Sequence, residues 1–234
     1  MSQASAAPQH GHVRWLMAGV ILLPALALAH DVSGRDASFV TSLQGVNFLP
    51  FAYLGAKHMV TGYDHLAFLA GVIFLLYRLR DVALYASLFA LGHSITLLGA
   101  VLLGYRANPF IVDAIIGLSV VYKGFENING FGNLRWRIDP RMAVLGFGLA
   151  HGLGLATKLQ DLQLSADGLV TNLLAFNFGV ETGQLAALAV MVLLFGLWRN
   201  TRYFRPAIFP ANVLLMGVGF VLAGYQFAGY LLQH

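Results

Sequence analysis

Long runs of apolar residues alternate with short polar connections along most of the chain. The runs cover about residues 57–77, 82–104, 109–128, 142–157, 168–197 and 208–232. A helix of about 20 predominantly apolar residues is long enough to cross the hydrocarbon core of a bilayer. The pattern therefore predicts an all-α fold, a polytopic transmembrane helical bundle of six spans within residues 57–234. The fourth run is short and rich in glycine, so we expect it to be tilted, close-packed or partly unwound.

A shorter apolar run precedes these six and has the features of a secretory signal peptide. It extends over residues 15–28, and Ala27-Leu28-Ala29 has the small residues of a signal-peptidase site. We expect residues 1–29 to be a cleaved signal peptide and residues 30–56 to form an extracytoplasmic segment. An uncleaved first transmembrane helix is the alternative. Cleavage would leave His30 at the N-terminus, where its amine and imidazole could chelate a metal, although any residue can follow a cleavage site.

Basic residues distinguish the two sides of the membrane, because cytoplasmic loops are enriched in Lys and Arg. If the N-terminal side is outside, the inner loops contain Arg78, Arg80, Arg135, Arg137, Arg141, Arg199, Arg202 and Arg205. The outer loops between spans hold only Arg106 and Lys158. The signal peptide and the charge bias thus predict the same topology in the inner membrane, with both the N- and the C-terminus extracytoplasmic.

The overall composition agrees with a membrane protein and excludes several other classes. Of the 234 residues, 58% are hydrophobic and 10% are charged, and the mean hydropathy is +0.72, which suits no ordinary soluble domain. The net charge of +4 resides in short loops, so it does not indicate a nucleic-acid partner. The chain has no cysteine, which excludes disulfides and thiolate metal sites.

The first span opens with three ionisable side chains, His58, Asp64 and His65. A charged group at bilayer depth costs about 3 kcal/mol or more, so such residues normally face the interior of a bundle or a wet cavity. His58 and His65 are seven residues apart, which places both imidazoles on nearly the same face of a helix. We expect both to face one cavity, with His58 near the outer surface and His65 deeper in the membrane.

Two further spans carry a histidine near their centre. His93 lies in the second span with Thr96 one turn later, and His151 lies in the fourth span beside glycines that let a backbone or a ligand come close. For a single intramembrane histidine, a hydrogen bond to a neighbouring helix explains the residue as well as metal ligation does. Histidines in three spans together favour ligation.

The fifth and third spans add more polar side chains. One polar stripe along the fifth span consists of Asn177, Glu181 and Gln184. An intramembrane carboxylate such as Glu181 needs a metal ion, a histidine or a proton as its partner. In the third span, Glu126 follows Lys123 by three residues, and this spacing predicts an ion pair at the cytoplasmic end. A role of Glu126 or Asn127 at an inner gate is the alternative.

Four spans together contribute candidate ligands to one intramembrane metal site. The candidates are His58, Asp64, His65, His93, His151 and Glu181, with Thr96, Asn177, Gln184, Glu126 and Asn127 as supporting polar groups. Imidazole and carboxylate suit nickel, cobalt, zinc, copper or iron, whereas calcium is disfavoured because nitrogen ligands predominate. The sequence contains no G-x-S-x-G, H-E-x-x-H or phosphate-binding glycine loop, so hydrolytic motifs do not indicate an enzyme.

Several of these residues belong to motifs that follow one another in a fixed order. The motifs are the H-x5-D-H spacing of residues 58–65, Gly92-His93-Ser94-Ile95-Thr96-Leu97, His151-Gly152-Leu153-Gly154 and the segment 176–184. Together they resemble the HupE/UreJ family of integral membrane proteins. The resemblance implies a nickel or nickel/cobalt permease in which the H-x5-D-H residues are the leading metal ligands and His93 is the next. Phe147 and Gly154 stand where the hydrogenase-linked branch is expected to have a second His and an acid, so the chain is more similar to a divergent second branch.

These observations support one leading hypothesis and two alternatives. The leading hypothesis is a permease in the lipid bilayer whose substrate is a divalent transition metal, nickel or cobalt by resemblance; an oligomer is compatible with it. In the first alternative, the chain is a membrane metalloprotein or metalloenzyme, for which His93 and His151 form a conceivable haem-binding pair. In the second, it is a metal-binding subunit that does not itself transport.

Overall fold

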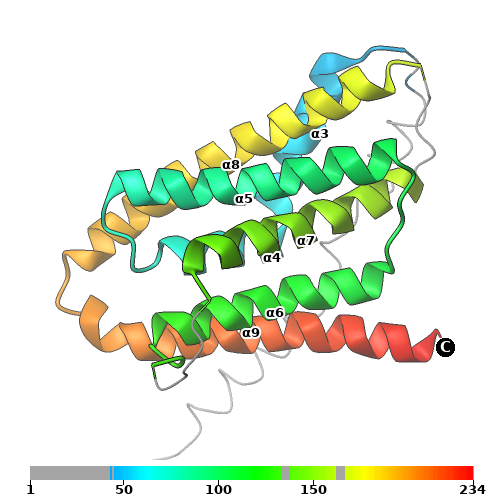
Figure 1. Cartoon of the computed structure of the whole chain (residues 1–234). Helices are drawn as coiled ribbons and strands as arrows, with labels where there is room; N and C mark the ends of the chain where they lie inside the picture. The colour runs from blue at the N-terminus through cyan, green and yellow to red at the C-terminus, as the bar shows by residue number, and fades with distance from the viewer. Residues whose placement is uncertain (1–42, 44, 133–137, 162–166, 234) are drawn as a thin grey trace, which may run out of the picture.

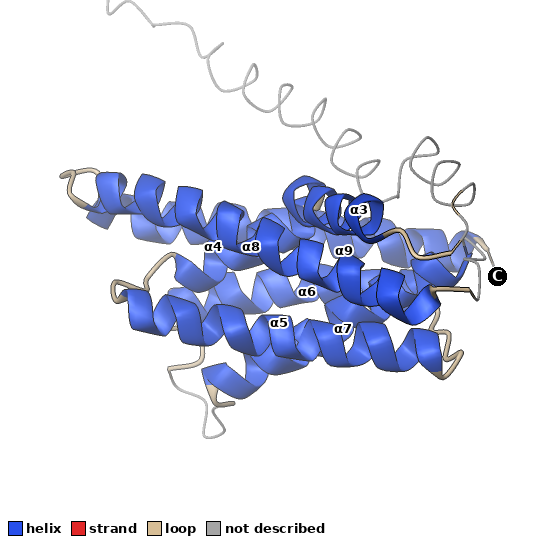
Figure 2. Cartoon of the chain, turned by 90° about the horizontal axis from the view of Figure 1, so that it is seen from above, coloured by secondary structure: helices blue, strands red, loops and turns tan. Residues whose placement is uncertain are grey.

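The computed structural model describes residues 43, 45–132, 138–161 and 167–233. These residues form seven helices and no strand (Figure 1, Figure 2). The helices are α3 Phe48–Thr61, α4 Tyr63–Ile73, α5 Leu79–Leu102, α6 Pro109–Asn127, α7 Pro140–Asp161, α8 Leu169–Arg199 and α9 Phe204–Leu232. The predicted all-α class is therefore confirmed. The predicted signal peptide of residues 1–29 and the candidate chelator His30 lie outside the described residues.

Six of the helices pack as three close pairs, α3 with α8, α5 with α7, and α6 with α9 (Figure 1). Glycine lies at the crossing in each pair, because a side chain there would meet the backbone of the partner helix. A Cβ atom added to Gly152 would overlap the carbonyl of His93, and one added to Gly55 would overlap that of Phe176. Gly117 faces the backbone of α9 in the same way. Small residues let membrane helices approach closely, and the resulting van der Waals contact holds the pairs together.

The short helix α4 lies between these pairs. It has 11 residues, of which seven are buried, and it contacts α3, α5, α6, α8 and α9. Two side chains hold its C-terminal end. Asn127 Nδ2 donates to the carbonyl of Gly71 at 2.9 Å, and Arg199 donates to the carbonyls of Ile73 and Phe74. The backbone of α4 is thus fixed by polar groups from α6 and α8.

Five of the six predicted spans correspond to single helices, α5 to α9, with ends that differ by a few residues. Four of them, α5, α7, α8 and α9, are long and apolar enough to cross a membrane. Helix α6 has 19 residues but carries the charged side chains Asp113, Lys123 and Glu126. Helix α7 is continuous over 22 residues and longer than the predicted run 142–157. The helix does not unwind at its glycines, and two of them, Gly148 and Gly152, pack against the backbone of α5.

The prediction of one continuous span over residues 57–77 is wrong. The chain forms two helices here, and α3 begins at Phe48, inside the segment that was assigned to the N-terminal region. Gly62 separates them with φ −73° and ψ 98°, an extended conformation that ends α3 and begins α4. A Cβ atom at Gly62 would lie 2.9 Å from His65 Nδ1 and 3.1 Å from the carbonyl of His58. A side chain at this position would therefore press on the imidazole of His65.

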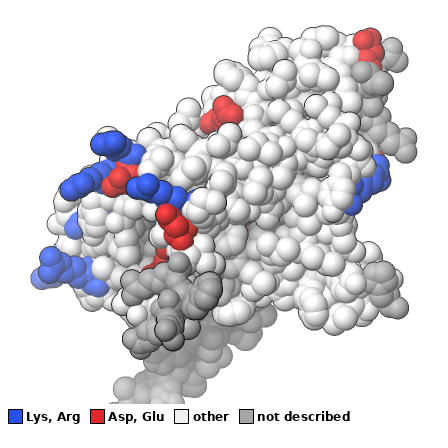
Figure 3. Space-filling view, in the orientation of Figure 1, with Lys and Arg blue, Asp and Glu red and all other residues white. Residues whose placement is uncertain are grey.

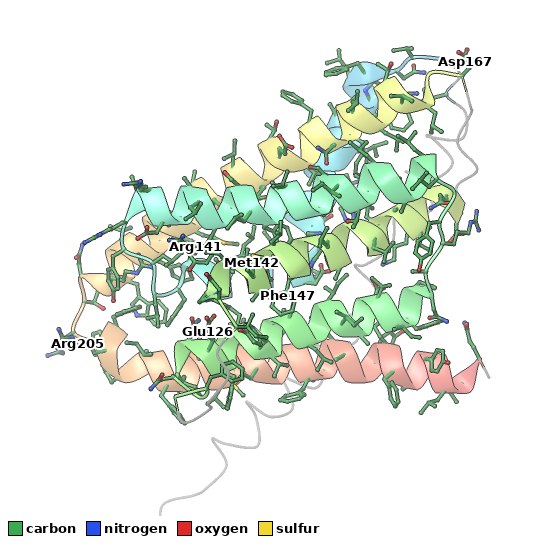
Figure 4. The ribbon with its side chains drawn as sticks, in the orientation of Figure 1. Glu126, Arg141, Met142, Phe147, Asp167 and Arg205 are labelled. Atoms are coloured by element: carbon green, nitrogen blue, oxygen red, sulfur yellow. The ribbon has the colours of Figure 1, made fainter. Side chains whose placement is uncertain are left out.

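Charged side chains gather at the ends of the bundle. Figure 3 shows most of the visible Lys and Arg side chains at the end that holds the α4–α5 and α8–α9 connections. The visible surface of the middle of the bundle is largely uncharged. This end, called here the basic end, carries Arg78, Arg80, Arg141, Arg199, Arg202 and Arg205. Figure 4 shows Arg141, Glu126 and Arg205 in this half of the bundle and Asp167 at the opposite end. The described arginines of the predicted inner loops thus share one end of the bundle, and Arg135 and Arg137 lie outside the described residues.

Candidate metal site

The break between α3 and α4 lies at a cluster of buried histidines. Asp64, His65 and His151 each offer a ligand atom, and these atoms lie within 4.8 Å of one another. The His65 ring centroid is 4.8 Å from that of His151, 5.2 Å from that of His58 and 6.0 Å from that of His93. Three imidazoles, from α3, α5 and α7, thus lie near the ring of His65 in α4, although the group with converging ligand atoms includes only Asp64, His65 and His151. We call the five residues the histidine cluster.

Hydrogen bonds orient two of the imidazoles. His65 Nδ1 lies 3.0 Å from Asp64 Oδ1, and His151 Nδ1 lies 2.7 Å from the carbonyl of Phe147, to which it donates. With Nδ1 protonated in this way, the lone pair of each ring is on Nε2. A hydrogen bond of this kind to a carboxylate or a carbonyl is the usual arrangement for a histidine that binds a metal through its other nitrogen.

Several nitrogen atoms of the cluster are buried without a hydrogen-bond partner among the described residues. These atoms include His65 Nε2 and both ring nitrogens of His93. His65 is 3% exposed and His93 is 1% exposed, so solvent at the protein surface does not reach them. Because buried polar atoms are nearly always hydrogen-bonded, such nitrogens indicate a site for a ligand or an ion. The donor set of imidazole with a nearby carboxylate fits nickel, cobalt, zinc, copper or iron.

Aromatic side chains enclose the cluster. The Phe89 ring lies 5.0 Å from that of His151 and 6.3 Å from that of His93, and Phe68 lies 5.6 Å from His151. Phe68 and Phe89 are both fully buried. An apolar shell of this kind lowers the local dielectric and limits the access of water, which strengthens the interaction between a cation and its ligands.

The ends of two helices contribute to the electrostatics of the site. Asp64 lies in the first turn of α4, where the partial positive charge of the helix N-terminus favours an anionic carboxylate. His58 lies in the last turn of α3, where the partial negative charge of the C-terminus favours a cation. Interrupted helices that meet inside a membrane provide ion sites of this type in transport proteins. His58 is ten residues past the start of α3, so a large part of that helix precedes it in the chain.

The predicted ligand Glu181 lies elsewhere. It is an exposed residue of α8, and its Oε1 accepts a hydrogen bond of 3.0 Å from Asn177 Nδ2. The same amide donates to Ser94 Oγ at 2.9 Å. Glu181 borders a hollow of about 400 Å³ between α5 and α8, whose lining is mostly apolar and also includes Gln184. Within the described ranges, the group of residues that could hold an ion does not include Glu181.

The other predicted polar residues connect helices. Thr96 Oγ1 donates to the carbonyl of Leu149 at 2.7 Å, and Gln184 Nε2 donates to that of Ala86 at 3.0 Å. These bonds join α5 to α7 and α8 to α5. The predicted ion pair is present, since Lys123 Nζ lies 2.6 Å from Glu126 Oε2.

Two polar contacts between helices were not predicted from the sequence. One is Arg199, whose guanidinium caps the C-terminal carbonyls of α4. The other is a buried ion pair between Asp113 of α6 and Lys158 of α7, with 2.9 Å between Lys158 Nζ and Asp113 Oδ2. Asp113 is an acid within a predicted span, so the cost of an intramembrane carboxylate was the signal that could have identified it.

Comparison with known proteins identifies the family. The sequence profile described as HupE / UreJ protein matches residues 34–234, which include the whole histidine cluster and all seven helices. No curated protein and no solved structure gives a match. The match confirms the resemblance seen in the motifs. The chain therefore belongs to the HupE / UreJ protein family, and this membership implies a membrane protein of the metal-transporter type.

Proposed function

We propose that the chain is a permease for a divalent transition metal ion and that the ion binds where α3 and α4 meet. The observation that carries this proposal is the burial of Asp64, His65 and His151 with ligand atoms within 4.8 Å of one another. A cation at this point balances the buried carboxylate and uses the lone pairs of the imidazoles. Nickel and cobalt are the favoured substrates, and zinc, copper and iron are the competitors to test.

Each member of the histidine cluster has a proposed role. His65 and His151 bind the ion through their ring nitrogens, and His93 and His58 complete the site from α5 and α3. Asp64 orients His65 through the 3.0 Å hydrogen bond and supplies the negative charge. Glu181 has no place in this site, and we assign it to the hydrogen-bonded group with Asn177 and Ser94.

We place the basic end of the bundle in the cytoplasm and both termini outside the inner membrane. The C-terminal end of α9 and the start of α3 lie at the end opposite the basic one, which supports this orientation (Figure 1). An ion from outside then reaches the cluster from the end opposite the basic one and leaves along α4. Because α4 is held by polar groups from α6 and α8, a small displacement of the helix pairs around it would open the inner side.

Uptake into liposomes tests this proposal. The purified protein is reconstituted and the accumulation of radiolabelled nickel and cobalt is measured for the parent, His65→Ala and His93→Ala. We expect both variants to lose nearly all uptake, because each removes a nitrogen ligand. Thr182→Val is the control, since Thr182 is exposed on α8 and its hydroxyl bonds only to the carbonyl of Phe178 in its own helix. Variants that accumulate the ions as well as the parent would contradict the assignment.

The same preparation separates the two alternative functions. A metal-binding subunit binds nickel or cobalt in the purified state but gives no uptake in liposomes. A haem protein shows a Soret band in its visible spectrum. The packing of Phe89 against both His93 and His151 weighs against haem, because the porphyrin would have to displace this buried ring.

A further inference from the structure

An ion pair between α6 and α7 lies between the histidine cluster and the end opposite the basic one. Lys158 lies seven residues after His151, which returns it to nearly the same face about 10 Å further along the helix. Exposure rises in this direction. His151 is 1% exposed, whereas the side chain of Lys158 is 19% exposed. Polar groups thus lead from the protein surface down to the cluster.

The two residues of this ion pair are Asp113 and Lys158. Their side chains are 7% and 19% exposed, and the ammonium of Lys158 contacts one carboxylate oxygen, Asp113 Oδ2, at 2.9 Å. The other oxygen, Oδ1, is buried and has no hydrogen-bond partner in the described part of the chain. A Cβ atom placed on Gly154 would lie 3.4 Å from this oxygen. Gly154 is one turn from both His151 and Lys158, so Oδ1 faces α7 just above the cluster.

A purely structural ion pair explains this arrangement poorly. Burial of two charges is repaid only when the geometry is good and further hydrogen bonds satisfy the remaining lone pairs. Here one oxygen of a carboxylate that is more than nine-tenths buried remains unused. The ammonium group of lysine is a compact charge on a flexible stem, so it can move aside more easily than a bidentate arginine.

We infer that Asp113 is an outer binding residue for an incoming divalent cation and that Lys158 is the tethered cation that occupies it in this conformation. The ligand is a partly hydrated divalent metal ion, which binds Oδ1 and displaces the ammonium of Lys158 from Oδ2. The attraction of a monovalent cation to the Asp113 carboxylate is no stronger than that of the Lys158 ammonium, which has the same charge. The pair therefore selects for doubly charged ions. This inference rests on the proposed function, since the ion then moves one to two turns along α7 to His151.

The binding stoichiometry of the purified protein tests the inference without any need for transport. Lys158→Met removes the ammonium that competes for Asp113. At cobalt or nickel concentrations too low to displace Lys158 in the parent, we expect this variant to bind one more ion per chain by equilibrium dialysis. The double variant Asp113→Asn/Lys158→Met removes both charges together, which avoids an unpaired buried charge, and it should lose the additional ion. Lys158→Met with the parent's stoichiometry would overturn the inference.

Uptake kinetics give the second readout. Asp113→Asn/Lys158→Met should raise the KM for nickel or cobalt about tenfold, equivalent to about 1.4 kcal/mol, with little change in the maximal rate. A structural pair predicts the opposite result, in which the double variant keeps the parent's KM. The matched control is Arg106→Gln/Asp161→Asn, which removes an exposed pair further out, with 3.0 Å between its charged atoms. Uptake by His65→Ala is measured in parallel to keep the two proposals distinct. If His65→Ala loses uptake while Asp113→Asn/Lys158→Met keeps the parent's KM, only the role of Asp113 is overturned.

Discussion

Asp64 and Glu181 are both carboxylates in apolar helices, and their surroundings are opposite. Asp64 is 1% exposed, lies at the N-terminus of α4 and contacts an imidazole. Glu181 is exposed at the edge of the hollow between α5 and α8 and accepts a hydrogen bond from Asn177. Hydropathy places both residues in membrane spans. Only the packing of the helices decides which of them meets ligands from other helices.

The difference between these regions shows what an ion site in a helical bundle requires. The histidine cluster draws side chains from α3, α4, α5 and α7, whereas the stripe with Asn177, Glu181 and Gln184 lies along α8 and is hydrogen-bonded to α5. A polar stripe on one helix can be satisfied by a single neighbour. Convergence of several helices is needed to collect three or more nitrogen and oxygen ligands around one ion.

The largest expected effect is on metal affinity. It comes from the same change, carboxylate to amide, made at Asp64 and at Glu181. Asp64→Asn should weaken nickel or cobalt binding about 10- to 100-fold, because it removes the charge that orients His65. Glu181→Gln should change the affinity by about twofold or less, as exposed substitutions usually do. Isothermal titration calorimetry on the detergent-solubilised variants measures both. Equal losses in the two variants would place Glu181 in the ion site after all.

The next effect concerns the close packing behind the cluster. Gly152→Ala puts a methyl group against the His93 carbonyl and Thr96, so we expect a loss of about 1–3 kcal/mol in the free energy of unfolding. Gly146→Ala in the same helix is the matched control, since a Cβ atom there meets nothing within 4 Å. Unfolding in mixed detergent micelles, followed by circular dichroism, compares them. Similar free energies of unfolding for Gly152→Ala and Gly146→Ala would show that α5 and α7 can move apart without a loss of stability.

The smallest effect is expected beside the hollow. Gln184→Leu removes the hydrogen bond to the carbonyl of Ala86, and interhelical hydrogen bonds in membranes contribute about 0.6 kcal/mol on average. Thr182→Val, whose hydroxyl bonds to its own helix, should have no measurable effect. The same unfolding assay applies. A loss as large as that of Gly152→Ala would mean that the contact between α5 and α8 matters as much as that between α5 and α7.

Most of the helices could be predicted from the sequence, and the break could not. Helices α5 to α9 follow long apolar runs, and the capping residues Asn108 and Pro109 mark the start of α6. A glycine within an apolar run is compatible with a continuous helix at a cost of about 1 kcal/mol. The interruption at Gly62 depends on contacts with other helices, and α3 packs along α8 through Gly55 and Gly179. These contacts are not visible in a hydropathy pattern.

The candidate site shows a similar division. His58 and His65 were expected to be neighbours because seven residues separate them on a helix, and their rings are indeed 5.2 Å apart. The two rings are not close because of the periodicity of one helix, as was expected, since Gly62 interrupts the helix between them. Glu181 was expected to be a ligand because it is an intramembrane acid, but residue type does not tell which way a side chain faces. Asp113 and Lys158 are 45 residues apart, so no local pattern relates them.

The break at Gly62 also has a consequence for the response to membrane potential. Helices α3 and α4 have 14 and 11 residues, and each rises about 16–21 Å. An ion at their junction has therefore crossed about half of the electric field. With the basic end in the cytoplasm, an inside-negative potential of about 100 mV pulls a doubly charged ion to this depth with about 2.3 kcal/mol. For the proposed site and orientation, this energy corresponds to an ion concentration at the cluster about 50-fold above that outside.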